Sequence, residues 1–272
     1  MRGVRSGTVI AKRPSVTAAP TPTPSSTDQA AAAIDLSVVV PVLNEAENIA
    51  GLVAEITAAL SGVIGFEIIY VDDGSSDDSL TVLTALKADN AFLRVIRHSR
   101  RAGQSAGTLS GVRAARGRLI ATLDGDGQND PADIPKLLAA YTDLAGPGPR
   151  MVTGHRVNRR DVWSKRVASR LANKLRGALL RDANPDTGCA LKLFEREMFL
   201  ALPYFDHMHR FLPALAKRQG CTVAVVPVNH RGRVHGDSKY SNLGRLVVGI
   251  PDLLGVGWLM RRAPADIERE EV

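Results

Sequence analysis

Short β-branched runs alternate with Ala- and Leu-rich segments along the chain from residue 34 onward. The β-branched runs predict strands at 36–42, 66–73, 93–98 and 118–124. The segments between them predict helices at 45–60, 77–88 and 104–116. Because these strands are apolar at consecutive positions, we expect helices to cover both of their faces. The pattern predicts an α/β fold with a mostly parallel sheet sandwiched by helices.

The second half of the chain shows a less regular pattern. A basic segment at 161–181 predicts a helix with an apolar stripe at Trp163, Val167, Leu171, Leu175 and Ala178. An interrupted, amphipathic helix is expected in the C-terminal segment. The remaining predicted elements are a helix from Pro131 to about 144, a strand at 151–156, a strand at 190–195, a helix near 209–219 and a strand at 221–228.

The first 33 residues are rich in Pro, Thr, Ala and Ser, which predicts a disordered tail. They lack the continuous apolar run of a secretory signal. No stretch of about 18 uninterrupted apolar residues occurs in the sequence. The nearest candidate, 243–260, is broken by Arg245, Pro251 and Asp252. We therefore expect one globular domain at 34–240, followed by a C-terminal helix and tail at 241–272.

Composition adds a hint about partners. With 44% hydrophobic and 23% charged residues the chain resembles ordinary globular proteins. The formal net charge of +7 favours an anionic partner, and nucleic acid, a membrane surface and phosphorylated small molecules all qualify. Cys189 and Cys221 show no CxxC spacing, so we expect two buried thiols in a reducing compartment, not a disulfide or a zinc site.

Polar motifs follow three predicted strands where they end, namely PVLNE, YVDDGS and LDGDGQND. The carboxyl ends of parallel strands meet at one edge of the sheet, where ligands bind in open α/β folds. In the third motif Asp124, Asp126 and Gln128 would point the same way along an extended chain. Three oxygen donors suit Mg²⁺ or Mn²⁺, although Asp and Gly are also ordinary turn residues. The second motif is equally typical of a turn and helix cap, for Asp77 in particular.

Several common catalytic motifs are absent from the sequence. It contains no GxxxxGK[ST] phosphate loop, no GxGxxG after the first strand, no GxSxG and no HExxH. His207 and His209 lie two residues apart, a spacing more typical of surface residues than of metal ligands. The oxygen-rich strand ends therefore remain the main candidate site.

The ordered motifs VVVPVLNE, IIYVDDGSSD and LDGDGQNDP resemble those of the family 2 glycosyltransferases, which have the GT-A fold. DTGCALKLF and RVHGDSKYS resemble the dolichyl-phosphate mannose synthase-like branch, which transfers a sugar from a nucleotide diphosphate to a polyprenyl phosphate. The resemblance extends from about residue 35 to 239. It implies a metal-dependent, inverting transferase that takes GDP-mannose or a UDP-hexose as donor.

The resemblance also implies roles for individual residues. It places the nucleotide of the donor at Pro41, Leu43, Glu45, Val71 and Asp73. It places Mg²⁺ or Mn²⁺ at Asp124, Asp126 and Gln128, with Gly125 among the substrate-binding residues. It places the phosphates at Arg156, Lys165 or Arg166, Arg233 and Lys239. The residues expected to be catalytic are Asp126, as a metal ligand and not a nucleophile, Arg233 and Lys239.

The acceptor decides which chemistry is needed. A phosphate monoester has its second pKa near about 6, so it is mostly a dianion at neutral pH and needs no general base. Because a polyprenyl phosphate stays in a bilayer, we expect a peripheral enzyme at the cytoplasmic face of the membrane, with no nucleic acid partner. Its own surface or a separate membrane subunit would hold it there. The candidate surfaces are helix 161–181 and a terminal set of Leu246, Ile250, Leu253, Leu254, Trp258 and Leu259 with Arg261 and Arg262.

Four other functions are consistent with parts of the sequence. The nearest is a non-processive glycosyltransferase with another acceptor. A processive polysaccharide synthase would carry QxxRW, which is absent. A sugar nucleotidyltransferase would have a Gly-rich loop after the first strand, where PVLNEAEN has no glycine. A non-catalytic, membrane-docked binding module would not need Asp124, Asp126, Arg233 and Lys239 together.

Overall fold

The structure is a computed structural model that describes residues 34–146, 148–157, 177, 179–180, 184–232 and 242–262, with the backbone alone for 242–248. The predicted tail at 1–33 lies outside the described residues, as does nearly all of the predicted basic helix at 161–181. The same holds for the segment 233–241.

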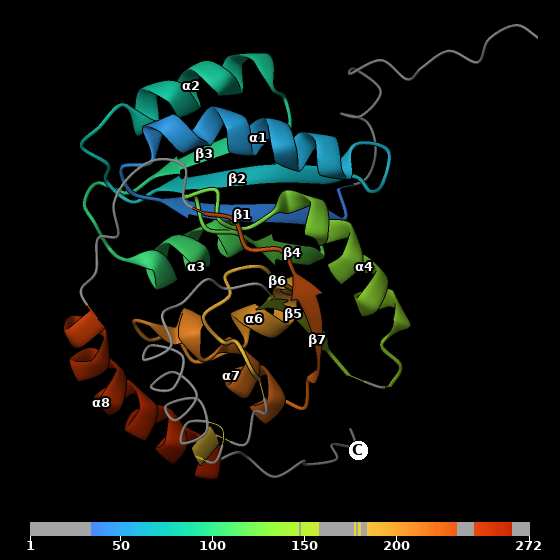
Figure 1. Cartoon of the computed structure of the whole chain (residues 1–272), viewed down its shortest axis with the longest axis vertical. Helices are drawn as coiled ribbons and strands as arrows, with labels where there is room; N and C mark the ends of the chain where they lie inside the picture. Colours follow the sequence, from blue (N-terminus) through green and yellow to red (C-terminus); the bar gives the residue numbers. More distant parts are fainter. Residues whose placement is uncertain are drawn as a thin grey trace, which may run out of the picture. The chain divides into compact units, whose positions relative to one another are not determined.

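A seven-stranded sheet forms the centre of the described domain, in the order β3-β2-β1-β4-β6-β5-β7 (Figure 1). Pairing is parallel between β1 and β2, β1 and β4, β2 and β3, and β5 and β7. Strand β6 is antiparallel to both β4 and β5. The predicted mostly parallel sheet is thus confirmed, with β6 as the exception. The strands are β1 (Leu36–Val42), β2 (Phe66–Asp72), β3 (Leu93–Arg97), β4 (Leu119–Thr122), β5 (Arg150–Arg156), β6 (Lys192–Glu195) and β7 (Thr222–Val228).

Helices cover both faces of the sheet, as the apolar strands predict (Figure 1). One face carries α1 (Ala46–Leu60), α2 (Ser79–Asp89) and α4 (Ile134–Asp143), the last entered through a 3-10 turn at Pro131–Asp133. The other face carries α3 (Gln104–Ala114), α6 (Arg196–Leu200), α7 (Leu212–Arg218) and α8 (Asn242–Arg261), with a 3-10 turn at Met208–Arg210 before α7.

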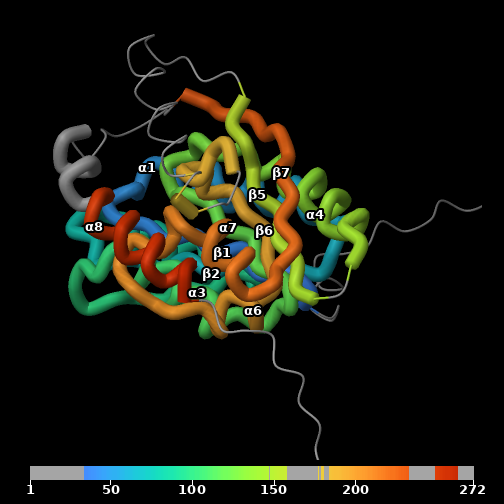
Figure 2. The backbone as a smooth tube through the Cα atoms, turned by 90° about the horizontal axis from the view of Figure 1, so that it is seen from below, coloured from blue at the N-terminus to red at the C-terminus, as the bar shows by residue number. Residues whose placement is uncertain are grey.

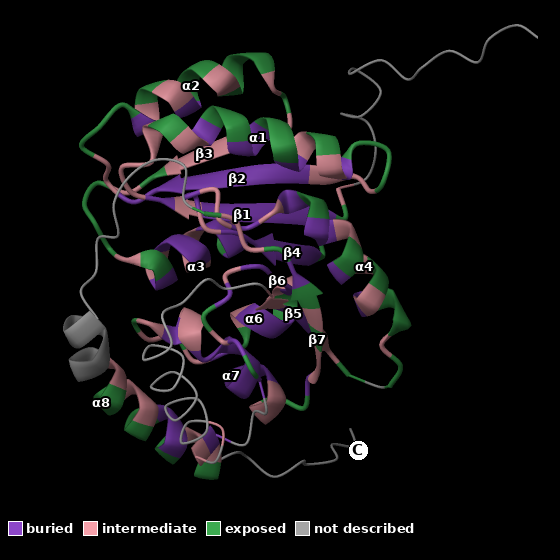
Figure 3. Cartoon of the chain, in the orientation of Figure 1, coloured by how far each residue is buried: buried purple, intermediate pink, exposed green. Residues whose placement is uncertain are grey.

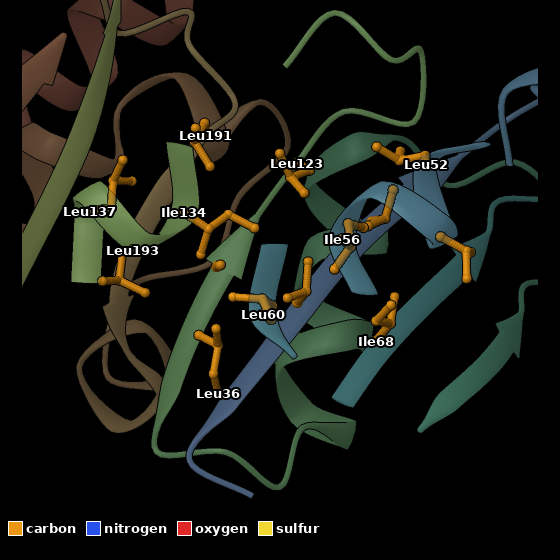
Figure 4. Packing of buried hydrophobic residues seen from close by; sticks show 14 of the residues in the cluster. Leu36, Leu52, Ile56, Leu60, Ile68, Leu123, Ile134, Leu137, Leu191 and Leu193 are labelled. Atoms are coloured by element: carbon orange, nitrogen blue, oxygen red, sulfur yellow. The ribbon is translucent and has the colours of Figure 1, made fainter. Parts of the chain in front are cut away.

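Strand β1 supplies side chains to two hydrophobic cores, because successive strand residues point to opposite faces. Val38 and Val40 are fully buried in the cluster under α1 and α4, and Val39 is fully buried in the cluster under α3. Full burial of one such side chain contributes about 1.5–3 kcal/mol, so both cores hold β1 in place. We call the cluster under α1 and α4 the first core and the cluster under α3 the second core. Figure 4 shows part of the first core, including Leu36, Ile56, Leu60, Ile68, Ile134 and Leu137.

Strands distant in sequence pair closely in the second half of the sheet. Strands β5 and β7 run side by side (Figure 2) and pair in register along the whole of β5. A side chain at Gly154 in β5 would meet Cys189 and Val228, so this glycine permits the close packing. Both cysteines are buried and free, as the sequence predicts.

Helix α8 is continuous across Pro251, where the sequence predicts an interruption. Val256 is buried in the second core, and Leu253 and Leu259 pack partly buried against it. Ile250, Leu254 and Trp258 are 53%, 63% and 60% exposed, so apolar side chains lie on the outer side of the helix too. Figure 3 shows this mixture of buried and exposed positions along α8. None of the helices in the described ranges has the length and apolarity needed to cross a membrane.

Candidate active site

The loops that follow β1 and β2 are bound together at the carboxyl edge of the sheet. Asn44 donates its backbone N–H to Ser75 Oγ at 2.9 Å and accepts the N–H of Ser76 on Oδ1 at 2.8 Å. Its φ of 53° lies in the left-handed region, which asparagine tolerates better than most residues. Asp73 also donates its backbone N–H to Val42 at 2.8 Å. The expected meeting of the strand ends at one edge is therefore present.

Asp77 joins the starts of two helices. Its carboxylate accepts the N–H of Ala46, the first residue of α1, at 3.2 Å and the N–H of Ser79, the first residue of α2, at 3.0 Å. Burial acts to raise the pKa of Asp77, but these hydrogen bonds outweigh it and lower the pKa below its ordinary value. Asp77 thus has the capping role that its motif suggests.

Asp73 holds the loop that leads into α3. Its carboxylate accepts the N–H groups of Ala102 and Gly103, both at 2.8 Å, and contacts His98 Nδ1 at 2.7 Å. The Asp73 side chain is buried, with 6% of its surface exposed. Next to it, Asp72 accepts the N–H of Ser75 on Oδ1 at 3.1 Å, and its buried Oδ2 has no hydrogen-bond partner among the described residues. The role of Asp73 toward a nucleotide stays a prediction.

The loop after β4 brings the predicted metal ligands to the same edge. A side chain at Gly125 would collide with the side chain of Val42, so only glycine lets this loop lie against the end of β1. Asp126 is buried and accepts the N–H of Gln128 on Oδ1 at 3.1 Å. Asp124 is half-buried and accepts a 2.7 Å hydrogen bond from the side-chain amide of Gln104. Glycine between two aspartates is therefore a packing requirement as well as a turn signal.

The two carboxylates repel each other. Burial raises the pKa of Asp124, the negative charge of Asp126 raises it further, and Lys192 and Arg156 act in the opposite direction. The pKa of Asp124 is about 6 as a result. A divalent cation between the two groups would remove this repulsion, so the donor set fits Mg²⁺ or Mn²⁺. The described residues contain no group of three or more His, Cys, Asp or Glu side chains placed to hold a metal ion. Asp124, Asp126 and the neutral amide of Gln128 stay the predicted ligands.

Arg156 and Lys192 place positive charge behind this loop. Arg156 ends β5 and forms a two-pronged ion pair with Asp186, in which both N–O distances are 2.7 Å. Lys192 is 3% exposed and donates to the backbone carbonyls of Thr187, at 3.4 Å, and Cys189. Burial lowers the pKa of Lys192, while Cys189, Asp124 and Asp186 act to raise it. When protonated, Lys192 lowers the pKa of Asp124, so the protonation of these two groups is linked.

Four residues that contact this edge or lie behind it are not predicted from the sequence: Gln104, Asp186, Lys192 and Arg231. Lys192 carried a signal, because it is a lone charge inside the apolar run ALKLF, where a strand is predicted. The sequence carries no such signal for the other three, Gln104, Asp186 and Arg231. Each of them contacts a partner distant in sequence, such as Asp124 for Gln104.

The other predicted substrate-binding residues differ from one another in how far they are buried and in which element they lie. Pro41 is half-buried near the end of β1, opposite Val71, which is fully buried in the second core. Leu43 is half-buried in the loop after β1. Glu45 precedes α1 and accepts a 2.8 Å hydrogen bond from the Asn48 side chain. The residues that lie outside the described ranges are Lys165, Arg166, Arg233 and Lys239.

Comparisons with known proteins show which family this chain resembles over most of its length. The model of the family described as glycosyl transferase family 2 matches residues 37–202. The dodecaprenyl-phosphate galacturonate synthase of Rhizobium johnstonii is 37% identical over 235 residues, which cover 84% of this chain and 68% of that protein. The undecaprenyl-phosphate 4-deoxy-4-formamido-L-arabinose transferase of Enterobacter sp. (strain 638) is 36% identical over 222 residues, which cover 80% of this chain and 66% of that protein.

Solved structures with a similar fold include glucosyl-3-phosphoglycerate synthase from Mycobacterium tuberculosis in complex with Mg²⁺ and uridine diphosphate. The TM-score is 0.63 at 19% identity, and the match covers 90% of this chain and 86% of that one. The same synthase in complex with Mn²⁺, uridine diphosphate and glucosyl-3-phosphoglycerate matches with a TM-score of 0.60 at 20% identity, over 91% of this chain and 88% of that one.

Proposed function

The chain belongs to glycosyl transferase family 2, and we propose that it transfers a sugar from a nucleotide diphosphate sugar to a polyprenyl phosphate. The GT-A fold and the glycosyltransferase class expected from the motifs are confirmed. The names of the two curated relatives support the acceptor, because both refer to a polyprenyl phosphate. About a third of each relative lies outside the match.

The observation that carries the proposal is the placement of Asp124 and Asp126 beside buried positive charge at the carboxyl edge of the sheet. A nucleotide diphosphate leaving group gains negative charge as the sugar–oxygen bond breaks. Asp124, Asp126 and Gln128 would hold Mg²⁺ or Mn²⁺, which supplies Lewis-acid stabilisation of that charge when bound. The loops after β1 and β2, fixed to each other by Asn44 and Asp77, form the wall against which we expect the nucleotide to bind.

The side chains around the acceptor need to position its phosphate. They do not need to deprotonate it. The acceptor is already mostly a dianion at neutral pH, so cations that neutralise and align it are sufficient. We assign this task to Arg233 and Lys239, and to Lys165 or Arg166. Arg156 is already paired with Asp186, so it contributes charge from a fixed position. Attack from the side opposite the diphosphate would invert the anomeric centre, and GDP-mannose and UDP-hexoses are the donors to test first.

The exposed side chains of α8 support binding of the protein to a membrane surface. Ile250, Leu254 and Trp258 are spaced four residues apart and are exposed, whereas Leu253 and Leu259 pack inward. Arg262 lies over the ring of Trp258, at 5.3 Å from its centroid, and Arg261 is exposed nearby. Apolar side chains with adjacent arginines match the interface of an anionic bilayer, where each basic residue contributes about 1 kcal/mol. We infer peripheral binding to the cytoplasmic leaflet, by this surface or through a separate membrane subunit.

A partition assay tests the proposed reaction directly. Purified protein is incubated with Mn²⁺, undecaprenyl phosphate and radiolabelled GDP-mannose or UDP-hexoses, and label is counted in the organic phase. We expect organic-phase label with at least one donor, and none with Asp126→Asn. No transfer from any donor would contradict the proposed pairing of donor and acceptor.

A further inference from the structure

The segment that follows β7 is hydrogen-bonded to residues 123–130, the loop after β4 that carries the predicted metal ligands. We call this loop the metal loop. His230 forms an antiparallel bridge with Asn129, and Arg231 donates its backbone N–H to the Gln128 carbonyl at 3.0 Å. We call residues 229–231 the clasp. It reaches the loop from the far end of the sheet, since β7 is the outermost strand on that side. Two parts of the chain about 100 residues apart are therefore joined at the candidate site.

The side chain of Arg231 fixes the clasp to two different elements. Its Nη1 contacts both carboxylate oxygens of Glu55 on α1, at 2.9 and 2.8 Å. Its Nη2 contacts Oδ1 of Asp130, two residues after Gln128, at 2.5 Å. One guanidinium thus bridges a helix of the first core and the metal loop. Because two carboxylates already engage it, Arg231 is better suited to holding the loop than to receiving a substrate phosphate.

Asn229 anchors the other end of the clasp. Its backbone N–H donates to Oδ2 of Asp133 at 2.6 Å, and its side-chain amide donates to Oδ2 of Asp130 at 3.3 Å. Asp133 is fully buried at the entrance to α4. The clasp is therefore anchored at both of its ends, through Asn229 and through Arg231.

The clasp determines how the Gln128 amide is turned. Its Nε2 donates to the backbone carbonyl of Arg231 at 3.4 Å. Only the NH₂ end of an amide can face a carbonyl, so this contact directs Oε1 away from the clasp. Within the described part of the chain, Gln128 Oε1 accepts no hydrogen bond from a protein group. The oxygen, the only atom of this amide that can bind a hard cation, is left available.

We propose that Arg231 is a positioning residue that orients Gln128 as the third, neutral ligand of the divalent cation. This inference rests on the proposed function, because it assumes a cation at Asp124 and Asp126. Groups that orient a metal ligand through a hydrogen bond typically change metal affinity about 10–100-fold when removed. Gln128 is a weak ligand and its hydrogen bond is long, so we expect a loss at the lower end, about tenfold.

Mn²⁺ binding tests the inference without reference to turnover. The dissociation constant is measured by electron paramagnetic resonance of free Mn²⁺, on the full chain, with UDP or GDP present. Arg231→Met should raise it about tenfold and Glu55→Gln by a smaller factor, because Glu55→Gln leaves the Asp130 contact intact. Arg94→Met is the matched control, since it removes an arginine–carboxylate pair with Glu67 that lies away from the metal loop, and it should leave the constant unchanged.

A double-mutant cycle shows whether the effect passes through Gln128. In a Gln128→Ala background, Arg231→Met should cause no further loss of Mn²⁺ affinity. Equal losses in both backgrounds, or unchanged affinity in folded Arg231→Met, would overturn the inference. If Arg231→Met does not fold, unchanged affinity in folded Glu55→Gln would overturn it. If the wild-type protein binds Mn²⁺ and only the inference fails, the proposed function stands; absence of Mn²⁺ binding by the wild type would overturn the metal site itself.

Discussion

Gln104, the first residue of α3, donates a 2.7 Å hydrogen bond from its side-chain amide to Oδ1 of Asp124. The bond fixes the carboxylate of Asp124 to α3, the helix that packs on the face of β1 opposite to α1. It also favours the charged form of Asp124, which burial and Asp126 disfavour. The geometry therefore places Gln104 among the residues that prepare the site for a cation.

Replacing Gln104 by leucine should reduce kcat/KM for sugar transfer about tenfold or more. A hydrogen bond to a charged group contributes about 1.5–3 kcal/mol, and its loss leaves Asp124 harder to ionise. Steady-state kinetics with saturating Mn²⁺ measures the effect. Gln219→Leu is the matched control, because Gln219 is exposed and its amide donates a long, 3.5 Å hydrogen bond to the Ala201 carbonyl. Equal kinetics in the two variants would show that the contact has no part in catalysis.

Asp126→Asn should lower kcat by several orders of magnitude while leaving the melting temperature close to that of the wild type. The substitution keeps the shape of the side chain but removes one of the two charges that would hold the cation. Activity should likewise disappear in EDTA and return with Mg²⁺ or Mn²⁺. Full turnover in EDTA would contradict a metal-dependent mechanism.

Stability should fall with acidity because of His209. Burial, with the nearby charges of Arg210 and Lys192, lowers the pKa of His209 to about 3, and its Nδ1 contacts Ser105 Oγ at 2.8 Å. Below pH 6.5 the unfolded chain binds a proton at this position that the folded chain excludes. The contribution is complete above pH 6.5 and is lost as the pH falls from there toward 3, at about 1.4 kcal/mol per pH unit.

Chemical denaturation between pH 7 and 5 measures this contribution. His209→Gln should be less sensitive to acid than the wild type, by about 2 kcal/mol at pH 5. Parallel pH profiles for the two proteins would show that His209 titrates normally in the folded state.

Binding to anionic liposomes should depend on the outer side of α8. Changing Ile250, Leu254 and Trp258 together to serine should abolish flotation with vesicles without lowering stability, because all three side chains are exposed. Substitution is preferable to deletion of the helix, since Val256 and Leu253 cover the second core. The matched control changes three exposed apolar residues elsewhere, Val63, Tyr204 and Val225. Equal flotation of both triple variants would refute the membrane surface on α8.

The sequence predicts the elements of the first half well, because β-branched runs and periodic helices depend on local patterns. It also locates the loop at Asp124 and Asp126, since charges after an apolar strand are visible without a structure. The antiparallel placement of β6 escapes prediction, because strand direction depends on tertiary pairing. The same is true of Arg231, whose partner Glu55 lies 176 residues away. Helix α8 differs from the predicted interruption because a helix can continue through one proline when packing supports it.

The close contact between Gly125 and Val42 determines how the candidate site would respond to local unfolding. Val42 ends a strand that is hydrogen-bonded on both sides and packed in two cores. Amide groups in such a strand open only at free energies near that of global unfolding. We therefore expect the peptide at Gly125, which packs against Val42, to stay in place until the strand itself opens. The shape of this peptide exists before any ligand arrives, so little conformational entropy is lost when the diphosphate binds.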